Sequence, residues 1–169
     1  GSAAGCRSRL PPSGTWDNVT IYVKIKGVFE KGIPIWVNQL NYYTNSKIIV
    51  DLDVECYTSM GLFIGFADGN HTENNIHPSN QVTVTGRIKT RYAGMSCISI
   101  AQGTNLAGNN TNGTILLKDL TLINDGTVSP IMCALPENIQ IQNVTSNSLI
   151  SDPNILEVGQ SIIRNTNYK

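Results

Sequence analysis

The sequence predicts an all-β fold: an antiparallel β-sandwich of the jelly-roll or immunoglobulin-like type, stapled by two disulfide bonds. Three observations predict it. One segment alternates cleanly between apolar and polar residues, four cysteines stand far apart, and turn signals recur at short intervals. The alternating segment, 47–56, ends in a cysteine on its apolar side, which is typical of an exported sandwich with a disulfide in its core.

Segment 47–56 is the clearest strand because its two sides differ in chemistry. Side chains alternate between the two faces of a strand, so a period of two residues indicates a strand with one buried face. The apolar side carries Ile48, Val50, Leu52, Val54 and Cys56. The polar side carries Lys47, Asp51, Asp53 and Glu55, with Ile49 as the exception.

The rest of the chain carries further short strands. Segment 19–25 alternates up to Gly27, and 33–40 repeats the pattern with Pro34 inside it, which favours an edge position because proline lacks an N–H. Gly86 indicates a bulge within its strand. Segment 154–163 is the one helix that the pattern allows. The other expected strands lie at 62–66, 82–88, 95–101, 115–123, 127–135 and 139–141.

Length and composition set the class of protein. The 169 residues fit one sandwich domain over 15–169, preceded by an irregular lead-in over 1–14. Twelve basic residues balance twelve acidic ones, so no electrostatic surface for nucleic acid is expected. No segment approaches the ~18 apolar residues of a membrane span, so no membrane insertion is expected. Charged residues make up only 14%, which favours a secreted protein with a surface of Asn, Thr and Ser.

The four cysteines allow three disulfide pairings. We favour Cys6 with Cys56 and Cys97 with Cys133, because sequential pairing requires no crossing of the chain. The alternative is a cytosolic protein with free thiols. A zinc or redox site is disfavoured because no C-x-x-C occurs.

Catalysis is not expected, and neither is a cofactor or a metal. The acidic side of 47–56 brings three carboxylates onto one face, where they could share a cation, but a solvated outer face explains them as well. The two histidines, His71 and His77, lie in one polar loop and supply too few ligands for zinc. No hydrolase, phosphate-loop or dinucleotide motif occurs.

The functional hint comes from loops rich in amide, acidic and aromatic residues. Sugars are bound by amides and carboxylates that satisfy hydroxyl groups, and by aromatic rings against the C–H face of the ring. The alternative is that Asn and Gly serve as turn formers. Glycosylation sequons at Asn18, Asn70, Asn109, Asn112 and Asn143 are near the number expected by chance. The candidate ligand-binding residues are Trp36, Tyr42, Tyr43, Asp68, Asn70, His71, Asn109 and Asn110.

The N-terminal third resembles the lectin domains of chaperone–usher fimbrial tip adhesins. Three features carry the resemblance: Cys6 near the start, the strand pattern N-V-x-I-Y-V-x-I over 18–25, and V-D-L-x-x-x-C over 50–56. The segment between the two strands is longer here, a second pair of cysteines is present, and Tyr57 and Thr58 do not match the residues after the second cysteine of the mannose adhesin. The resemblance implies a disulfide-stapled sandwich with a binding site at its loop end, and it carries no sugar specificity over.

The sequence therefore predicts an extracellular, non-enzymatic adhesin or lectin-like domain at a fimbrium tip. Its expected partner is a host glycan or glycoprotein, with other pilus subunits as further partners. The alternative is a secreted or viral glycoprotein ectodomain, or a fimbrial structural subunit, that binds a protein partner.

Overall fold

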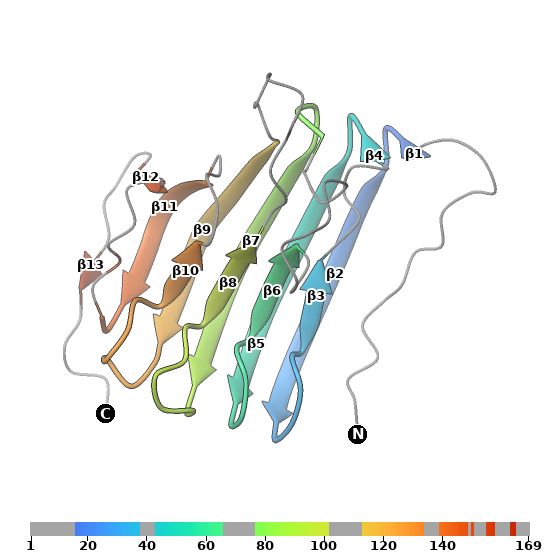
Figure 1. Cartoon of the computed structure of the whole chain (residues 1–169). Coiled ribbons are helices and arrows are strands. Elements are labelled where there is room, and N and C mark those ends of the chain that lie inside the picture. Colours follow the sequence, from blue (N-terminus) through green and yellow to red (C-terminus); the bar gives the residue numbers. More distant parts are fainter. Residues whose placement is uncertain are drawn as a thin grey trace.

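The computed structural model is a β-solenoid, in which the chain winds into a coil of parallel β-strands (Figure 1). It describes residues 16–37, 43–65, 77–101, 113–133, 139–148, 150, 155–157 and 163–164. Every described element is a strand. The strands are β1 (Trp16–Asp17), β2 (Thr20–Phe29), β3 (Ile35–Val37), β4 (Tyr43–Thr44), β5 (Lys47–Cys56), β6 (Leu62–Gly65), β7 (Gln81–Thr90), β8 (Ile98–Ala101), β9 (Thr114–Ile123), β10 (Ile131–Cys133), β11 (Ile139–Ser146), β12 (Ile155–Glu157) and β13 (Ile163–Arg164).

Each turn of the coil contributes one long strand and one short strand. The long sheet has the order β12-β11-β9-β7-β5-β2, with β13 also paired to β11. The short sheet has the order β10-β8-β6-β3. Every pairing is parallel, and β5 is in register with β2 and β7 along its whole length. The two sheets face each other across the core, and the chain advances along the coil by one strand spacing per turn (Figure 1).

The expected antiparallel sandwich, jelly-roll or immunoglobulin-like, is wrong. Consecutive long strands are not joined by hairpins; the chain passes through a short strand of the opposite sheet before it returns. Alternation of apolar and polar residues reports which face of a strand is buried and carries no information on strand direction. The turns that follow β2, β5, β7 and β9 are corners of the coil, because each leads into a short strand of the opposite sheet.

The positions of the strands follow the sequence pattern more closely than their direction does. β5 spans Lys47–Cys56, the predicted strand, and its apolar side is buried. Pro34 precedes β3, which is the edge strand of the short sheet as predicted. The helix expected over 154–163 is wrong, because β12 and β13 occupy parts of that segment. The predicted lead-in over 1–14 lies outside the described residues.

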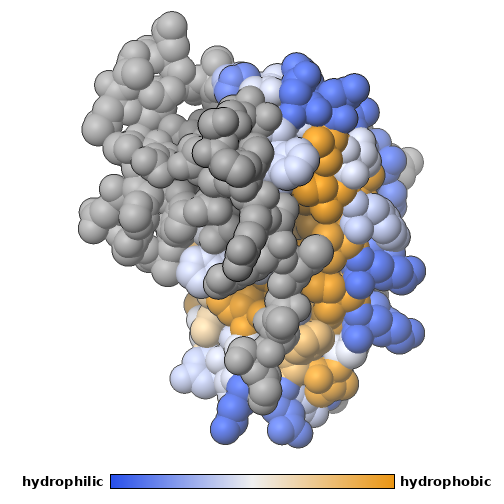
Figure 2. Space-filling view, turned by 90° about the vertical axis from the view of Figure 1, so that its right-hand side faces the viewer, coloured by the Kyte–Doolittle hydropathy of each residue, from blue (hydrophilic) through white to orange (hydrophobic). Residues whose placement is uncertain are grey.

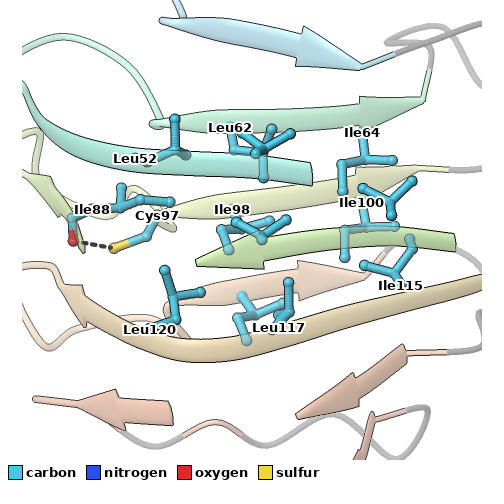
Figure 3. Packing of buried hydrophobic residues seen from close by; sticks show 14 of the residues in the cluster. Leu52, Leu62, Ile64, Ile88, Cys97, Ile98, Ile100, Ile115, Leu117 and Leu120 are labelled. Carbon is cyan, nitrogen blue, oxygen red and sulfur yellow. Dashed lines mark hydrogen bonds between the residues drawn. The ribbon is translucent and has the colours of Figure 1, made fainter. Parts of the chain in front are cut away.

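Side chains at the same register position stack inside the coil (Figure 3). Val50 and Val84 pair directly, and neither is exposed to solvent. Ile98 of the short sheet pairs with Leu62 in the same way, and both are fully buried. Each such side chain stabilises the fold by roughly 1.5–3 kcal/mol relative to an exposed position.

Polar side chains close one corner of the coil by reaching from one turn to the next. Ser46 Oγ accepts a hydrogen bond from the Val19 N–H at 3.1 Å, and Asn80 Oδ1 accepts one from the Ser46 N–H at 2.9 Å. The Asn80 amide also donates to the Tyr43 carbonyl at 2.5 Å. Ser46 and Asn80 are both buried. These bonds satisfy backbone groups that would otherwise be costly to bury.

A stacked irregularity lies at mid-strand in β9 and β11. Val84 and Gly86 of β7 pair with Leu117 and Leu120 of β9, so β9 carries one residue more than β7 in this interval. The extra residue, Asp119, has a φ of 48°. Asn143 of β11 has a φ of 53° and donates a hydrogen bond to Asp119 at 2.7 Å. The extra residue shifts the alternation of inward side chains, from Ile115 and Leu117 before it to Leu120 and Leu122 after it.

The two expected disulfides are also wrong. Cys56 and Cys97 are buried free thiols, so neither Cys6–Cys56 nor Cys97–Cys133 forms, and no disulfide occurs among the described cysteines. Cys6 itself lies outside the described residues. Cys97 Sγ instead contacts the Ile123 carbonyl at 3.2 Å. It also contacts the Ile88 carbonyl at 3.8 Å (Figure 3). A cysteine on the inward face of a strand packs as a small apolar residue, so its position did not require a bond.

Gly86 has no tolerance for a side chain. Its φ is +102°, and a Cβ atom there would lie 2.0 Å from the Leu52 carbonyl oxygen. Gly86→Ala should therefore lower the free energy of unfolding by at least about 3 kcal/mol, measured by chemical denaturation. Gly32→Ala is the matched control, since Gly32 has a φ of +80° with open space around it. A similar cost for both would show that the clash at Leu52 does not matter.

The buried thiols should resist alkylation in the native state. Burial raises the pKa of Cys56 to about 11 and that of Cys97 to about 12. Native protein treated with iodoacetamide at pH 8 should stay unlabelled at both, and unfolded protein should be labelled at both, read by peptide mass spectrometry. Because both folded-state values are raised, their contribution to stability is complete below about pH 8.5 and is lost as the pH rises toward 11–12. A Cys56 or Cys97 peptide found in a disulfide would contradict the structure.

Candidate functional site

The short sheet ends along one edge where polar segments of the chain begin. Gly65 at the end of β6 pairs with Ala101 at the end of β8, and Val37 at the end of β3 pairs with Ile64. Segments 38–42, 66–76 and 102–112, which follow these strands, lie outside the described residues. The parallel topology therefore starts the three predicted binding segments from neighbouring strands of one sheet.

Of the two predicted binding residues that the structure describes, Trp36 lies on the surface. Ile35 and Val37 point into the core, so the indole of Trp36 points outward, and it is 46% exposed. Its Nε1–H donates to the Gly65 carbonyl oxygen. Its ring meets that of Phe63 edge to face, with 5.3 Å between centroids and 71° between planes. The two contacts hold a large aromatic surface in a fixed orientation beside the start of 66–76.

The other predicted binding residues fall into two groups. Tyr43, on β4, is 4% exposed and belongs to the apolar core, so it is not part of the outer surface. Tyr42, Asp68, Asn70, His71, Asn109 and Asn110 lie outside the described residues. The structure therefore places Trp36 on the outer surface near the paired ends of β3 and β6, and Tyr43 in the core.

A row of residues that the sequence did not single out continues from Trp36 across the short sheet. The register runs from Trp36 to Phe63, Ser99 and Met132. Phe63 and Ser99 stand between core residues of their strands and so point to the outer face, yet they are only 7% and 1% exposed. Met132 is 47% exposed. Ser99 Oγ has no hydrogen-bond partner among the described residues. Only the parallel register, which relates residues a full turn apart, would have revealed this row.

A shallow hollow lies at the Met132 end of the row. Its volume is about 300 Å³, and Met132, Ile131 and Val128 supply much of its apolar lining. The remaining lining residues are Gly94, Ser96, Ser129 and Cys133. The hollow extends the outer surface of the short sheet away from Trp36, so the two ends of the row differ: one is aromatic and the other aliphatic.

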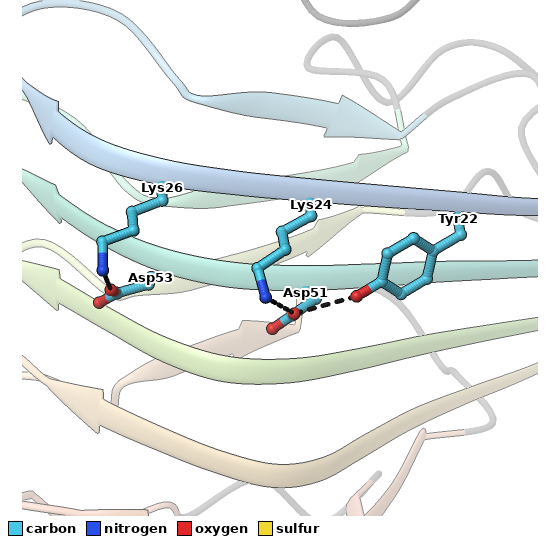
Figure 4. Close-up of polar contacts among 5 residues, drawn as sticks. All are labelled: Tyr22, Lys24, Lys26, Asp51 and Asp53. Atoms are coloured by element: carbon cyan, nitrogen blue, oxygen red, sulfur yellow. Dashed lines mark hydrogen bonds and ion pairs between the residues drawn. The ribbon is translucent and has the colours of Figure 1, made fainter.

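Asp51 and Asp53 lie on the outer face of β5 and are paired with lysines of the neighbouring β2 (Figure 4). Lys24 contacts Asp51 at 3.1 Å, and Tyr22 Oη donates to the same carboxylate at 3.1 Å. Lys26 contacts Asp53 at 3.1 Å. These contacts favour a charged outer face over a cation site, and no cluster that could hold a metal occurs within the described residues.

Further ion pairs continue this charged face toward β7. Arg87 lies 3.9 Å from Asp53, so that carboxylate has a cation on each side. Arg91 donates to Glu55 and lies over the ring of Tyr57, 5.5 Å from its centroid. Hydrogen bonding to Lys24 holds the pKa of Asp51 below its usual value, and Arg91 does the same for the pKa of Glu55.

The remaining predicted features give no site among the described residues. His77 Nδ1 lies 2.8 Å from Ser79 Oγ, which caps the turn before β7, and His71 is outside the described residues. No described helix could cross a membrane.

Comparisons with known proteins found no match to a family model, to a curated protein or to a solved structure. The resemblance to fimbrial adhesins is therefore neither supported nor excluded by them.

The Lys24–Asp51 ion pair should give stability that depends on pH. Because its folded-state pKa is lowered, the contribution of Asp51 is complete above its unfolded value, near 3.9, and is lost as the pH falls through the folded value. We expect the thermal midpoint to fall between pH 5 and pH 2, and to fall less in Asp51→Asn, measured by circular dichroism. An equal fall in both proteins would show that the Lys24–Asp51 pair contributes nothing.

Proposed function

We propose that this protein binds a glycan, without catalysis, through the edge of the short sheet around Trp36. The observation that carries the proposal is the exposed indole of Trp36, fixed by Phe63 and the Gly65 carbonyl. An immobilised aromatic ring can lie against the C–H face of a sugar with little loss of side-chain entropy. A flexible surface tryptophan would have to lose that entropy on binding.

The polar groups that a sugar requires are supplied, in this proposal, by the segments that follow β3, β6 and β8. Their sequences contain Tyr42, Asp68, Asn70, His71, Asn109 and Asn110, whose amides, carboxylates and rings suit hydroxyl groups. What supports their cooperation is the parallel register, which starts the segments from adjacent strands. In an antiparallel sandwich the same segments could have been at opposite ends.

The proposed setting is attachment to a host-surface glycan or glycoprotein outside the cell. The free thiols of Cys56 and Cys97 remove the disulfide argument for export, so this setting now depends on the Asn- and Thr-rich, charge-poor composition. The placement at a fimbrium tip depends on the resemblance alone and stays a prediction.

A glycan-array screen tests the proposal directly. The protein should show saturable binding to one family of sugars, and Trp36→Ala should weaken that binding about five- to twelvefold, because stacking on an aromatic ring contributes on the order of 1–1.5 kcal/mol. The thermal midpoint of each variant reports whether the fold is intact.

Met132→Ala is the matched control. Met132 lies on the same row and is 47% exposed, against 46% for Trp36, but it is not aromatic. Binding should survive this change. A blank array with folded protein, or equal losses for Trp36→Ala and Met132→Ala, would contradict the proposal and favour a role in binding a protein partner.

A further inference from the structure

The long sheet ends at β2, and among the described strands β2 pairs only with β5. The neighbouring β1 pairs with β4 instead. The carbonyls of Val19 and Phe29 accept hydrogen bonds at 2.9 and 3.0 Å from the β5 side of the chain. The N–H and C=O groups of successive residues point to opposite sides of a strand. The groups of the even-numbered residues between Val19 and Phe29 therefore point to the open side of β2.

The inward side chains at this edge are less covered than those stacked behind them. Val23 and Ile25 are only half-buried, whereas their register partners Val50 and Leu52 are 0% and 1% exposed. Figure 2 shows an apolar column along this side of the molecule. The interior of the coil therefore reaches the surface at β2, beside a row of backbone donors and acceptors.

The charges on the outer side of the edge favour one kind of neighbour. At one register position the charge of the side chain alternates from strand to strand: Lys26 on β2 is followed by Asp53 on β5 and then by Arg87 on β7. Lys24 is likewise followed by Asp51. The Lys24 and Lys26 side chains remain 64% and 75% exposed despite these pairs. A further strand beside β2 would continue this alternation if it placed acidic side chains next to Lys24 and Lys26.

Two occupants fit this edge poorly. A second copy that paired β2 with β2 would bring Lys24 and Lys26 close to the same lysines of its partner, which is unfavourable across a strand pair. The chain's own first fifteen residues contain Arg7 and Arg9, no acidic residue, and the pair Pro11-Pro12. Neither supplies acidic side chains on alternate residues.

We propose that the β2 edge is a docking site for an extended strand of another protein, in which apolar residues alternate with acidic ones. The apolar residues would cover Val23 and Ile25, the acidic residues would pair with Lys24 and Lys26, and the backbones would form a further strand pair. The site is separate from the proposed glycan surface, which lies on the opposite sheet, so either proposal can fail without the other.

A fluorescent peptide with the sequence of residues 48–55 is a suitable probe, because IIVDLDVE has the required alternation. Fluorescence anisotropy should show saturable binding, and the same peptide with Lys at its three acidic positions should bind about tenfold more weakly. Lys24→Gln with Lys26→Gln should remove most of this preference. Lys24→Glu with Lys26→Glu should reverse the preference, so that the basic peptide binds more tightly. The thermal transition shows which of the two double variants is folded and can be compared.

Two further measurements separate strand pairing from nonspecific attraction. Peptides N-methylated on alternate residues, in the two possible phases, should differ, because only one phase places the methyl groups against β2. Sedimentation velocity of the protein alone should show a monomer. A dimer lost in the lysine variants, equal binding of acidic and basic peptides, or no binding at millimolar peptide would each overturn the proposal.

Discussion

The parallel register of the long strands is the constraint on which the rest of the structure depends. Because β2, β5 and β7 run in the same direction and in register, equivalent side chains stack from turn to turn. Apolar residues such as Val50 and Val84 therefore form continuous columns inside the coil. The same register sets Lys26, Asp53 and Arg87 side by side outside it. Core, charged face and strand ends are three consequences of one alignment.

The corners show how the register is fixed. Ser46 and Asn80 each accept a hydrogen bond from a backbone N–H of the previous turn, so a shift by one residue would leave those groups unsatisfied in a buried place. Ser46 follows Val19 by 27 residues and Asn80 follows Ser46 by 34. The turns thus differ in length, and the difference is absorbed in the segments between the short and long strands.

The sequence predicts the buried face of a long strand better than it predicts how the strands are connected. The alternation over Lys47–Cys56 gave the bounds and the buried face of β5, because burial acts on every second residue. It could not give strand direction, which depends on partners far along the chain. An inward cysteine such as Cys56 satisfies the same pattern whether it is a thiol or half of a disulfide. Turn lengths that vary also hide the periodicity that marks a coiled repeat.

One residue of the candidate surface has a signal in the sequence. Trp36 stands out in the sequence as an aromatic residue beside a polar loop, and the structure places it on the surface. Tyr43 has the same character in the sequence but packs in the core, since only the tertiary structure distinguishes the two positions. Phe63, which orients the indole, has no local signal at all. It is recognised only when residues one turn apart are set side by side.

Disulfide trapping between β5 and β7 tests the parallel register most directly. Lys47 pairs with Gln81 at one end, and Glu55 pairs with Lys89 at the other. If the strands are parallel and in this register, Lys47→Cys with Gln81→Cys, and Glu55→Cys with Lys89→Cys, should both cross-link on mild oxidation, identified by peptide mass spectrometry. The crossed pair, Lys47→Cys with Lys89→Cys, should not, because eight residues of strand separate its members by roughly 26 Å. Cross-linking of the crossed pair alone would show antiparallel strands and contradict the account.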